Sequence, residues 1–545
     1  MMQLRPYQTT WVNDIYAQWQ AGHRNVLAAL PTGGGKAVGL CHIISQHRGA
    51  SCVIAHRQEL VGQLCLTLGK FGVRHRVIGP KNLVQMIVEV QMDELGTSFY
   101  DPNAATGVAG VDTLVRRKKQ LNGWLDQVTL GVHDEAHHNL RENKWGTAHG
   151  MFPNAWWLGV TATPTRADGK GLGAHADGFY DCLIEGMNMG ELIAIGALSK
   201  YRIFAPPSDL DLGGVKISDA TGDYNKDQLN KEVKRSTLVG DVVQQYLRIA
   251  PGKLGVTFAN SVETATILAN RYNAAGVPAE VVSAKTPDRT RHEFIRRLRS
   301  RQLLQLVNVD LFGEGFDLPA IEVVSMARPT QSYAVFAQQF GRALRPMPDK
   351  PHAIIIDHVG NTMRHGLPDA PRHWTLDRRE RGAKSKRDPD VMPVTTCTEC
   401  FSSYEAVYKA CPWCGYVPVP AGRSDPIFVD GDLFELDAAT LAKMRGEIER
   451  VDAPDANILK WAREQGHSEK VAYAIAKNQR LRQEAQVPLR EAIAWWAGWQ
   501  RYLKRSDSES YRRFFHTFGV DVSTAQTLGR KDAGVLADRI WRTMT

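Results

Sequence analysis

The sequence predicts an α/β fold with two tandem lobes, each a parallel sheet flanked by helices, followed by two smaller regions. Three observations predict this class: short apolar runs alternate with helix-like stretches, a glycine-rich turn follows the first run, and the composition changes after residue 360. A chain of 545 residues is long enough for three or four domains. Its hydrophobic fraction of 43% supports several cores and excludes a mainly disordered chain.

The apolar runs fall into two series, and stretches of helical periodicity separate several of them. That alternation is typical of parallel βαβ units. In the first lobe, residues 1–200, the expected strands are 26–30, 51–56, 107–111, 130–134 and 157–163. In the second lobe, residues 201–362, they are 253–260, 279–284, 303–310, 321–327 and 353–359.

The remainder of the chain has a different character. Residues 363–392 are rich in Arg and Lys and are predicted to be a basic linker, and residues 430–545 have the periodicity of a helical domain. Trp495, Trp496 and Trp499 are assigned to one helical stripe. Such a stripe belongs to a core more often than to a base-stacking platform, so we expect it to be buried.

The charge and hydropathy of the chain limit its partners. Lys and Arg exceed Asp and Glu by nine, which suits a polyanionic partner such as nucleic acid. The sequence has no apolar run of about 18 residues and no apolar segment near its start. We therefore expect no membrane span and no secretory signal, and we predict a cytoplasmic protein.

A glycine-rich turn, Thr32-Gly33-Gly34-Gly35-Lys36-Ala37, lies between an expected strand and an expected helix. Consecutive glycines allow backbone N–H groups to surround phosphate oxygens, and Lys36 would contact the β- and γ-phosphates. Ala37 occupies the position where Ser or Thr normally supplies a ligand to Mg²⁺. The alternative interpretation is an ordinary glycine turn with a surface lysine.

Two adjacent acids end a second apolar run about 100 residues later. Asp134 can hold Mg²⁺, directly or through water, and Glu135 can orient and deprotonate an attacking water. His137 is predicted to connect this site to the Thr161–Thr163 segment rather than to bind a metal.

Four cysteines form two CxxC pairs within the predicted module 393–420: Cys397, Cys400, Cys411 and Cys414. Each pair directs two thiolates to one point, so two pairs can complete a tetrahedral S₄ site of the kind that Zn²⁺ prefers. A module this small needs metal to fold. We therefore predict a structural zinc ribbon.

In this order the motifs resemble those of the superfamily 2 DEAH-type helicases. The resemblance covers about residues 1–360 and rests on LRPYQ (4–8), the glycine turn, VIAHRQEL (53–60), GVAGVDTL (107–114), DEAH (134–137), TAT (161–163), TFANSVETA (257–265), VNVDLFGEGFDLPAI (307–321) and QQFGRALRP (338–346). It implies two RecA-like lobes that bind ATP and Mg²⁺ in a shared cleft, with a nucleic-acid strand across both.

The resemblance also implies roles for individual residues. Arg5 and Gln8 would contact the nucleotide, with Gln8 reading adenine, and Gly315 and Asp317 would couple nucleotide state to strand grip. Arg342 and Arg345, three apart on a predicted helix, would reach the γ-phosphate as arginine fingers, and the small Gly341 would allow the close approach this requires. The implied strand contacts are Arg57, Thr113, Thr161 and Thr163.

Beyond residue 390, domain order and the cysteine pairs resemble RadD-type bacterial helicases and related phage helicases. This favours a translocase or helicase on DNA rather than RNA, working in replication, repair or recombination, with a possible protein partner at the C-terminal region. Two alternatives stay open. One is an ATP-gated nucleic-acid clamp that hydrolyses poorly because of Ala37, and the other is the motor of a restriction-like system. For the latter we find no convincing nuclease; Asp227 with Glu232 and Lys234 falls where a helix is expected.

Overall fold

The computed structural model describes residues 2–206, 210, 212–218, 221–235, 238–309, 321–370, 372–378, 392–418, 451, 455–464 and 468–544. The chain divides into two compact units. The first, the motor unit, comprises residues 1–383 with 401–403, and the second, the C-terminal unit, comprises 384–400 with 404–545. No helix in the described part of the chain combines the length and apolar character that crossing a bilayer requires.

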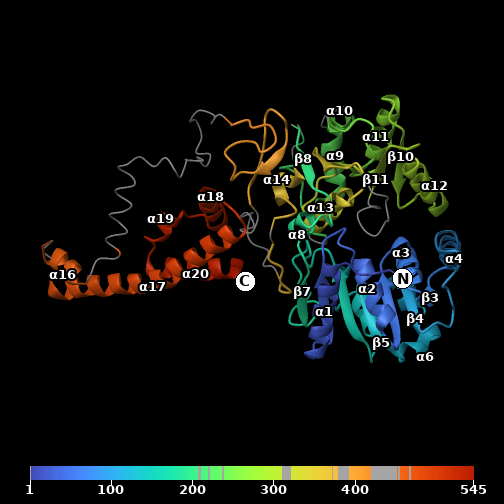
Figure 1. Ribbon diagram of the computed structural model, residues 1–545, viewed down its shortest axis with the longest axis horizontal. Helices are drawn as coiled ribbons and strands as arrows, with labels where there is room; N and C mark the ends of the chain where they lie inside the picture. The colour runs from blue at the N-terminus through green and yellow to red at the C-terminus, as the bar shows by residue number, and fades with distance from the viewer. Residues whose placement is uncertain are drawn as a thin grey trace. The chain divides into compact units, whose positions relative to one another are not determined.

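The first lobe of the motor unit contains a seven-stranded parallel sheet in the order β3-β4-β2-β5-β6-β1-β7 (Figure 1). Its strands are β1 (Asn25–Ala29), β2 (Ala50–Ala55), β3 (His75–Ile78), β4 (Thr106–Gly110), β5 (Val128–Asp134), β6 (Trp156–Thr161) and β7 (Cys182–Glu185). Its helices are α1 (Pro6–Gln20), α2 (Lys36–Gln46), α3 (Gln58–Lys70), α4 (Lys81–Leu95), α5 (Val111–Arg116), α6 (Asn122–Leu125), α7 (Lys144–His149) and α8 (Met189–Ala194).

The second lobe contains a six-stranded parallel sheet in the order β10-β11-β9-β12-β13-β8. Its strands are β8 (Tyr201–Phe204), β9 (Gly255–Ala259), β10 (Ala279–Ser283), β11 (Gln305–Val309), β12 (Val323–Ala327) and β13 (Ala353–Asp357). Its helices are α9 (Lys226–Arg235), α10 (Leu238–Ile249), α11 (Val262–Ala274), α12 (Asp288–Arg299), α13 (Tyr333–Gly341) and α14 (Asn361–His365). The two-lobe α/β prediction is confirmed, and the Asp227–Glu232 segment lies in a helix as expected.

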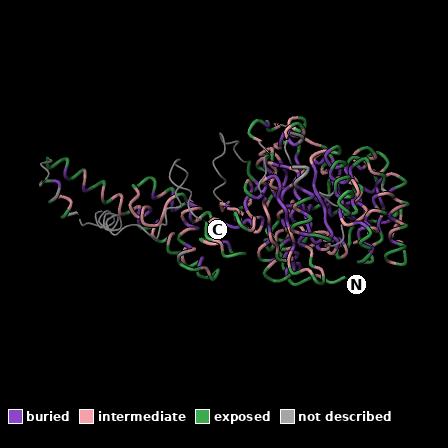
Figure 2. Tube along the Cα trace, turned by 90° about the horizontal axis from the view of Figure 1, so that it is seen from above, coloured by how far each residue is buried: buried purple, intermediate pink, exposed green. Residues whose placement is uncertain are grey.

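Burial explains why the predicted strands were visible in the sequence. The central strands β1, β2, β9, β11 and β12 are almost entirely buried, and Figure 2 shows this as continuous buried trace through the lobes. Strands with both faces covered by helices read as unbroken apolar runs. The edge strands β7 and β8 each have a single buried residue, so they carry no such run and were not predicted.

Residues 372–378 of the predicted linker pack against lobe 1. Leu376 is buried in a cluster of lobe 1 side chains that includes Leu172 and Tyr180, and its carbonyl accepts a hydrogen bond from Gly173. Arg378 forms an ion pair with Asp177 at 2.6 Å. The segment is mostly basic, so its composition does not reveal that the apolar side chain of Leu376 packs on lobe 1.

The C-terminal unit contains the cysteine module and a helical region. Its elements are β14 (Val394–Thr396), β15 (Ser403–Glu405), α16 (Asp455–Glu464), α17 (Glu469–Tyr502), α18 (Asp507–Phe518), α19 (Val522–Ala525) and α20 (Arg530–Met544). The helical prediction is confirmed for the described residues. Glu405 of the module forms a buried ion pair with Arg513 of α18, so module and helices share one body.

The tryptophan stripe was predicted incorrectly. Trp496 packs in the helical core with Leu489 and Phe514, but Trp495 is 61% exposed and Trp499 is 48% exposed. Consecutive helical residues lie about 100° apart, so Trp495 and Trp496 cannot share one face.

Candidate functional site

The glycine turn begins α2 and has the backbone conformation that its sequence predicts. Gly33 and Gly35 have φ values of +88° and +86°, in the left-handed region where other residues are strained. A Cβ on Gly35 would lie 2.2 Å from Nε2 of Gln8. The turn is also held from α1, because Tyr7 Oη and Gln8 Nε2 both donate to the Gly34 carbonyl, at 3.0 and 3.1 Å.

Lys36 is the first residue of α2, and its Nζ donates to the Leu30 carbonyl at 3.3 Å. Burial lowers the pKa of this lysine, the carboxylates of Glu135 and Asp134 oppose the shift, and the positive charge of Arg342 adds to it. Lys36 therefore interacts electrostatically with two acids of its own lobe and one arginine of the other lobe. A phosphate chain carries the negative charge that would balance these two cations.

Asp134 and Glu135 lie at the carboxyl end of β5 and are 6% and 8% exposed. Burial and the charge of Glu135 raise the pKa of Asp134 to about 7, although Lys36 opposes the shift. Glu135 has a φ of +51°, which is uncommon for a residue other than glycine. Its Oε2 is buried and accepts no hydrogen bond from the described residues. Two buried carboxyls whose negative charge is only partly balanced fit a site that binds a cation.

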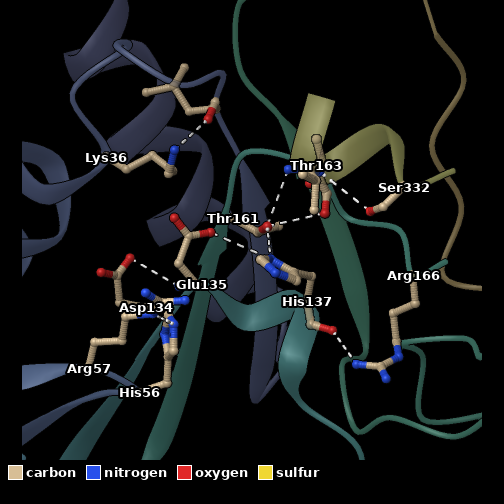
Figure 3. Close-up of polar contacts among 12 residues, drawn as sticks. Lys36, His56, Arg57, Asp134, Glu135, His137, Thr161, Thr163, Arg166 and Ser332 are labelled. Atoms are coloured by element: carbon tan, nitrogen blue, oxygen red, sulfur yellow. Dashed lines mark hydrogen bonds and ion pairs between the residues drawn. The ribbon is translucent and has the colours of Figure 1, made fainter. Parts of the chain in front are cut away.

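His137 connects Glu135 to the next strand, in line with the predicted link to the Thr161–Thr163 segment. Its Nδ1 lies 3.0 Å from Thr161 Oγ1 at the end of β6 and 3.5 Å from Glu135 Oε2. Thr161 Oγ1 also accepts from the Thr163 backbone N–H at 3.2 Å. Figure 3 shows Lys36, Asp134, Glu135 and His137 around a common space at the strand ends.

The second lobe contacts the glycine turn through the end of α13. A Cβ on Gly341 would lie 2.7 Å from Cβ of Thr32, so the predicted close approach at Gly341 is confirmed. Arg342 is the residue after Gly341 and is 9% exposed, and its positive charge acts on Lys36. One detail was wrong: α13 ends at Gly341, Arg342 starts a 3₁₀ turn, and Arg345 is extended. The two arginines therefore do not lie together on one α-helical face.

A second bridge joins the lobes beside the predicted strand contact Arg57. Arg291 of α12 forms an ion pair with Glu59 of α3, and the two side chains are 9% and 19% exposed. Arg57 donates through Nε to His56 Nε2 at 2.9 Å, and His56 lies near Asp134. The VIAHRQEL segment therefore lies between the acids of lobe 1 and α12 of lobe 2.

The remaining predicted residues differ in where they lie. Thr113 is half-buried in α5, whereas Thr161 and Thr163 are buried, so neither of the latter presents a hydroxyl to a strand in this state. Gln8 accepts from the Arg5 backbone N–H at 2.9 Å, so its amide is engaged on both sides. Gly315 and Asp317 lie outside the described residues.

Ala37 lies in the first turn of α2 and packs, half-buried, against the lobe core. A methyl group has no oxygen for a cation. The protein ligands available to Mg²⁺ here are the carboxylates, so water would complete the coordination, in keeping with the usual preference of this ion.

The four cysteines of the CxxC pairs converge as predicted. All four sulfurs lie within 4.8 Å of one another, and the Cys397–Cys414 and Cys400–Cys411 separations are each 3.6 Å. Zn–S bonds of about 2.3 Å in a tetrahedron place sulfurs roughly 3.8 Å apart. The cluster is therefore compatible with a Zn²⁺ site. Gly415, with φ at +74°, completes the second turn by donating to the Cys411 carbonyl.

Several residues of the site were not predicted. Arg166 donates to the His137 carbonyl at 2.8 Å and is held by Asp168 at 2.6 Å. The Glu59–Arg291 pair also went unnoticed. A single arginine or glutamate on a helix carries no periodic or spacing signal, so only the tertiary fold reveals such contacts.

Comparisons with known proteins agree with this geometry. The family model of the type III restriction enzyme res subunit matches residues 1–166, and that of the helicase conserved C-terminal domain matches residues 239–347. A 51.5 kDa protein of a Lactococcus phage is 31% identical over 389 residues, covering 71% of this chain and 76% of that protein.

A Saccharomyces cerevisiae protein, named as a candidate ATP-dependent helicase, IRC3, is 26% identical over 378 residues, covering 66% of this chain. The match covers only 51% of the yeast protein, about half its length. A fragment of a candidate HsdR subunit of a Vibrio vulnificus type I restriction enzyme aligns with a TM-score of 0.49 at 18% identity, covering 67% of this chain and 66% of that one.

The two family models together cover most of both lobes, in the order in which the site uses them. The chain belongs to the superfamily 2 helicases, as an ATP-dependent enzyme with a two-lobed motor.

Proposed function

We propose that this helicase hydrolyses ATP between its lobes and uses the cycle to move along DNA. One observation carries the assignment of roles: Gly341 of lobe 2, directly before the buried Arg342, packs against Thr32 of the glycine turn that leads into Lys36. An arginine that completes the site from the other lobe makes hydrolysis depend on closure of the cleft.

In this proposal each side chain has one task. Lys36 neutralises the β- and γ-phosphates, and Asp134 holds Mg²⁺, which offsets the charge of the transferring group. Glu135 orients and deprotonates the water, while Arg342 and Arg345 stabilise charge that develops on the γ-phosphate. The phosphate turn is formed by Thr32, Gly33, Gly34, Gly35 and Ala37. On the α1 side, Arg5 and Gln8 would contact the nucleotide.

The contact of His137 with Thr161 supports a path from the nucleotide to the strand. Loss of the γ-phosphate frees Glu135, and His137 then transmits the change to β6 and the Thr163 backbone. Arg57 and Thr113 are the proposed phosphate contacts of the strand. Phosphate contacts position a strand without reading its sequence, as a motor that steps along any sequence requires.

DNA is proposed over RNA because the family model that matches residues 1–166 is that of a restriction-enzyme subunit. The decisive experiment measures ATP turnover with single-stranded, duplex, forked and branched DNA and with matching RNA, at stated salt. Strong stimulation by DNA alone supports the proposal. Equal or stronger stimulation by RNA contradicts it. The DNA structure that stimulates ATP turnover most would indicate whether the protein works in replication, repair or recombination, as proposed from its resemblance to RadD-type helicases.

Ala37→Thr separates a working motor from an ATP-gated clamp. In this proposal the carboxylates and Arg342 supply the charges that hydrolysis needs, so the motor needs no hydroxyl at position 37, and the variant should change turnover by only a few-fold. A large rise in single-turnover hydrolysis would favour the clamp.

The cysteine cluster is proposed as a structural zinc site. Its four thiolates leave no coordination position open for a substrate, which is typical of structural rather than catalytic zinc. When bound, the ion supplies folding energy to the module through Cys397, Cys400, Cys411 and Cys414.

A further inference from the structure

Helix α17 carries a row of exposed aromatic side chains about a quarter turn away from its core contacts. Trp495, Trp499 and Tyr502 are spaced by four and three residues and are 61%, 48% and 75% exposed. We call these three residues the aromatic row. Residues at this spacing lie one above another along a helix, so the row spans about 10 Å.

The exposed rings of the aromatic row also contact neighbouring rings. Trp499 and Tyr502 stack with their centroids 5.5 Å apart and their planes 22° apart, and Trp495 lies 6.1 Å from Trp541 of α20. The side chains that hold the helix, including Leu489 and Trp496, face the core about a quarter turn away from the row. Large exposed aromatic groups of this kind mark interaction sites.

The same face of α17 carries cations toward its N-terminal end. Counting in steps of three and four residues back from Trp495 leads through Glu491, Pro488 and Glu484 to Arg480, Lys477, Tyr473 and Lys470, all of them exposed. Residues 468–544 contain 14 Lys and Arg against 8 Asp and Glu. The face thus joins a basic end to an aromatic end, with two acids between.

We propose that this face of α17 binds single-stranded nucleic acid, with bases stacked on Trp495, Trp499 and Tyr502 and phosphates near Lys470, Lys477 and Arg480. The inference goes beyond the motor cleft, and it rests on the proposed function only in taking a nucleic-acid strand as the partner. Stacking needs flat exposed rings because every base has a π-face, and backbone contact needs cations.

The chemistry favours an unpaired strand over the other two occupants. Bases inside a duplex are stacked on each other and offer no face to an external ring, so a duplex would engage only the cations. A protein interface of ordinary affinity buries a broad apolar patch, whereas the row is narrow and is flanked by Glu491 and Arg501.

The test measures binding of a fluorescent thymidine oligonucleotide to the full chain without ATP, by anisotropy and by quenching of tryptophan fluorescence. Trp495→Ala and Trp499→Ala should each weaken binding about five- to ten-fold, and together they should abolish most of the quenching. Val487→Ala and Val535→Ala, which remove exposed apolar side chains away from the row, are the matched controls and should change neither signal.

Charge variants test the other end of the same face. Lys477→Gln should reduce the salt dependence of binding without changing the quenching, whereas Glu491→Gln should tighten binding a few-fold. Trp499→Phe should recover much of the affinity lost in Trp499→Ala, because a phenyl ring still stacks. Melting curves identify any variant that fails to fold.

Three results would overturn the inference: unchanged affinity in the double tryptophan variant, wild-type quenching absent at saturation, or loss of self-association in that variant with strand binding intact. The last would identify a protein interface. Because binding is measured without ATP, these failures are distinct from failure of the motor assignment, which nucleic-acid-stimulated turnover reports.

Discussion

The motor unit and the C-terminal unit build their functional groups in opposite ways. In the motor, side chains from α2, β5, β6 and the end of α13 meet although they are up to about 300 residues apart in sequence. In the C-terminal unit, four cysteines within 18 residues make the cysteine cluster and one helix face carries the aromatic row. A site assembled by the fold depends on lobe geometry, whereas a local site depends on a few side chains, so the two should respond differently to the same kinds of change.

The largest expected effect lies in the motor. Lys36→Ala should reduce ATP turnover by at least about a thousand-fold, because no other side chain of the turn can neutralise the phosphates. Steady-state phosphate release measures it, with the exposed Lys70→Ala of the same lobe as control. Turnover near that of the control would remove the phosphate-loop assignment, while the cysteine cluster would be unaffected.

Metal removal should act on the other unit alone. Chelation, or Cys400→Ser, should eliminate the fold of residues 393–418 and the melting transition of the C-terminal unit, because so small a module lacks a sufficient core. Calorimetry and metal analysis check this, and Cys182→Ser, a thiol outside the cluster, is the matched control. An ordered module in a metal-free chain would contradict the zinc assignment.

We expect the ionised carboxylate of Asp134 to lower the free energy of unfolding of the motor, although ATP turnover requires this carboxylate. Its pKa is raised to about 7, so its folded-state advantage is present in acid and is lost as pH rises through about 7. Asp134→Asn should therefore stabilise the ligand-free motor at pH 8 by roughly 1–3 kcal/mol while abolishing turnover. Melting temperatures between pH 5 and pH 8 test this, with the exposed Asp126→Asn as control. A variant less stable than wild type at pH 8 would show that neighbouring groups balance the charge of the Asp134 carboxylate in the folded motor.

The smallest effect concerns the bridge between the lobes. Glu59→Gln should slow strand-stimulated turnover a few-fold by weakening closure, and the exchanged pair Glu59→Arg with Arg291→Glu should restore part of the loss. The control is Glu94→Gln, because the Arg299–Glu94 pair at 3.8 Å joins the same two lobes but is about half exposed. Equal effects of the two single variants would indicate general electrostatics rather than a specific bridge.

The sequence predicted those parts of the molecule that are set by backbone chemistry. Buried strands such as β2 and β11 read as apolar runs, and the glycine turn, the acid pair and the cysteine pairs follow from local geometric demands. Gly341 was also interpretable, since only a residue without a side chain fits against Thr32.

Features decided by tertiary packing escaped prediction. Short edge strands such as β7 lack two buried faces, and Leu376 gave no sign among basic neighbours that it anchors residues 372–378 on lobe 1. The end of α13 at Gly341 and the split of the three tryptophans between core and surface both depend on helix boundaries and phase, which composition does not determine.

The central claim is that a residue of lobe 2 completes a site whose lysine and acids belong to lobe 1. Arg342→Ala tests it most directly in a single-turnover assay, with ATP affinity measured separately and the exposed Arg271→Ala of lobe 2 as control. We expect near-normal ATP binding and a chemical step slowed by about 10³–10⁵. Hydrolysis within a few-fold of the control, at saturating ATP and strand, would contradict it.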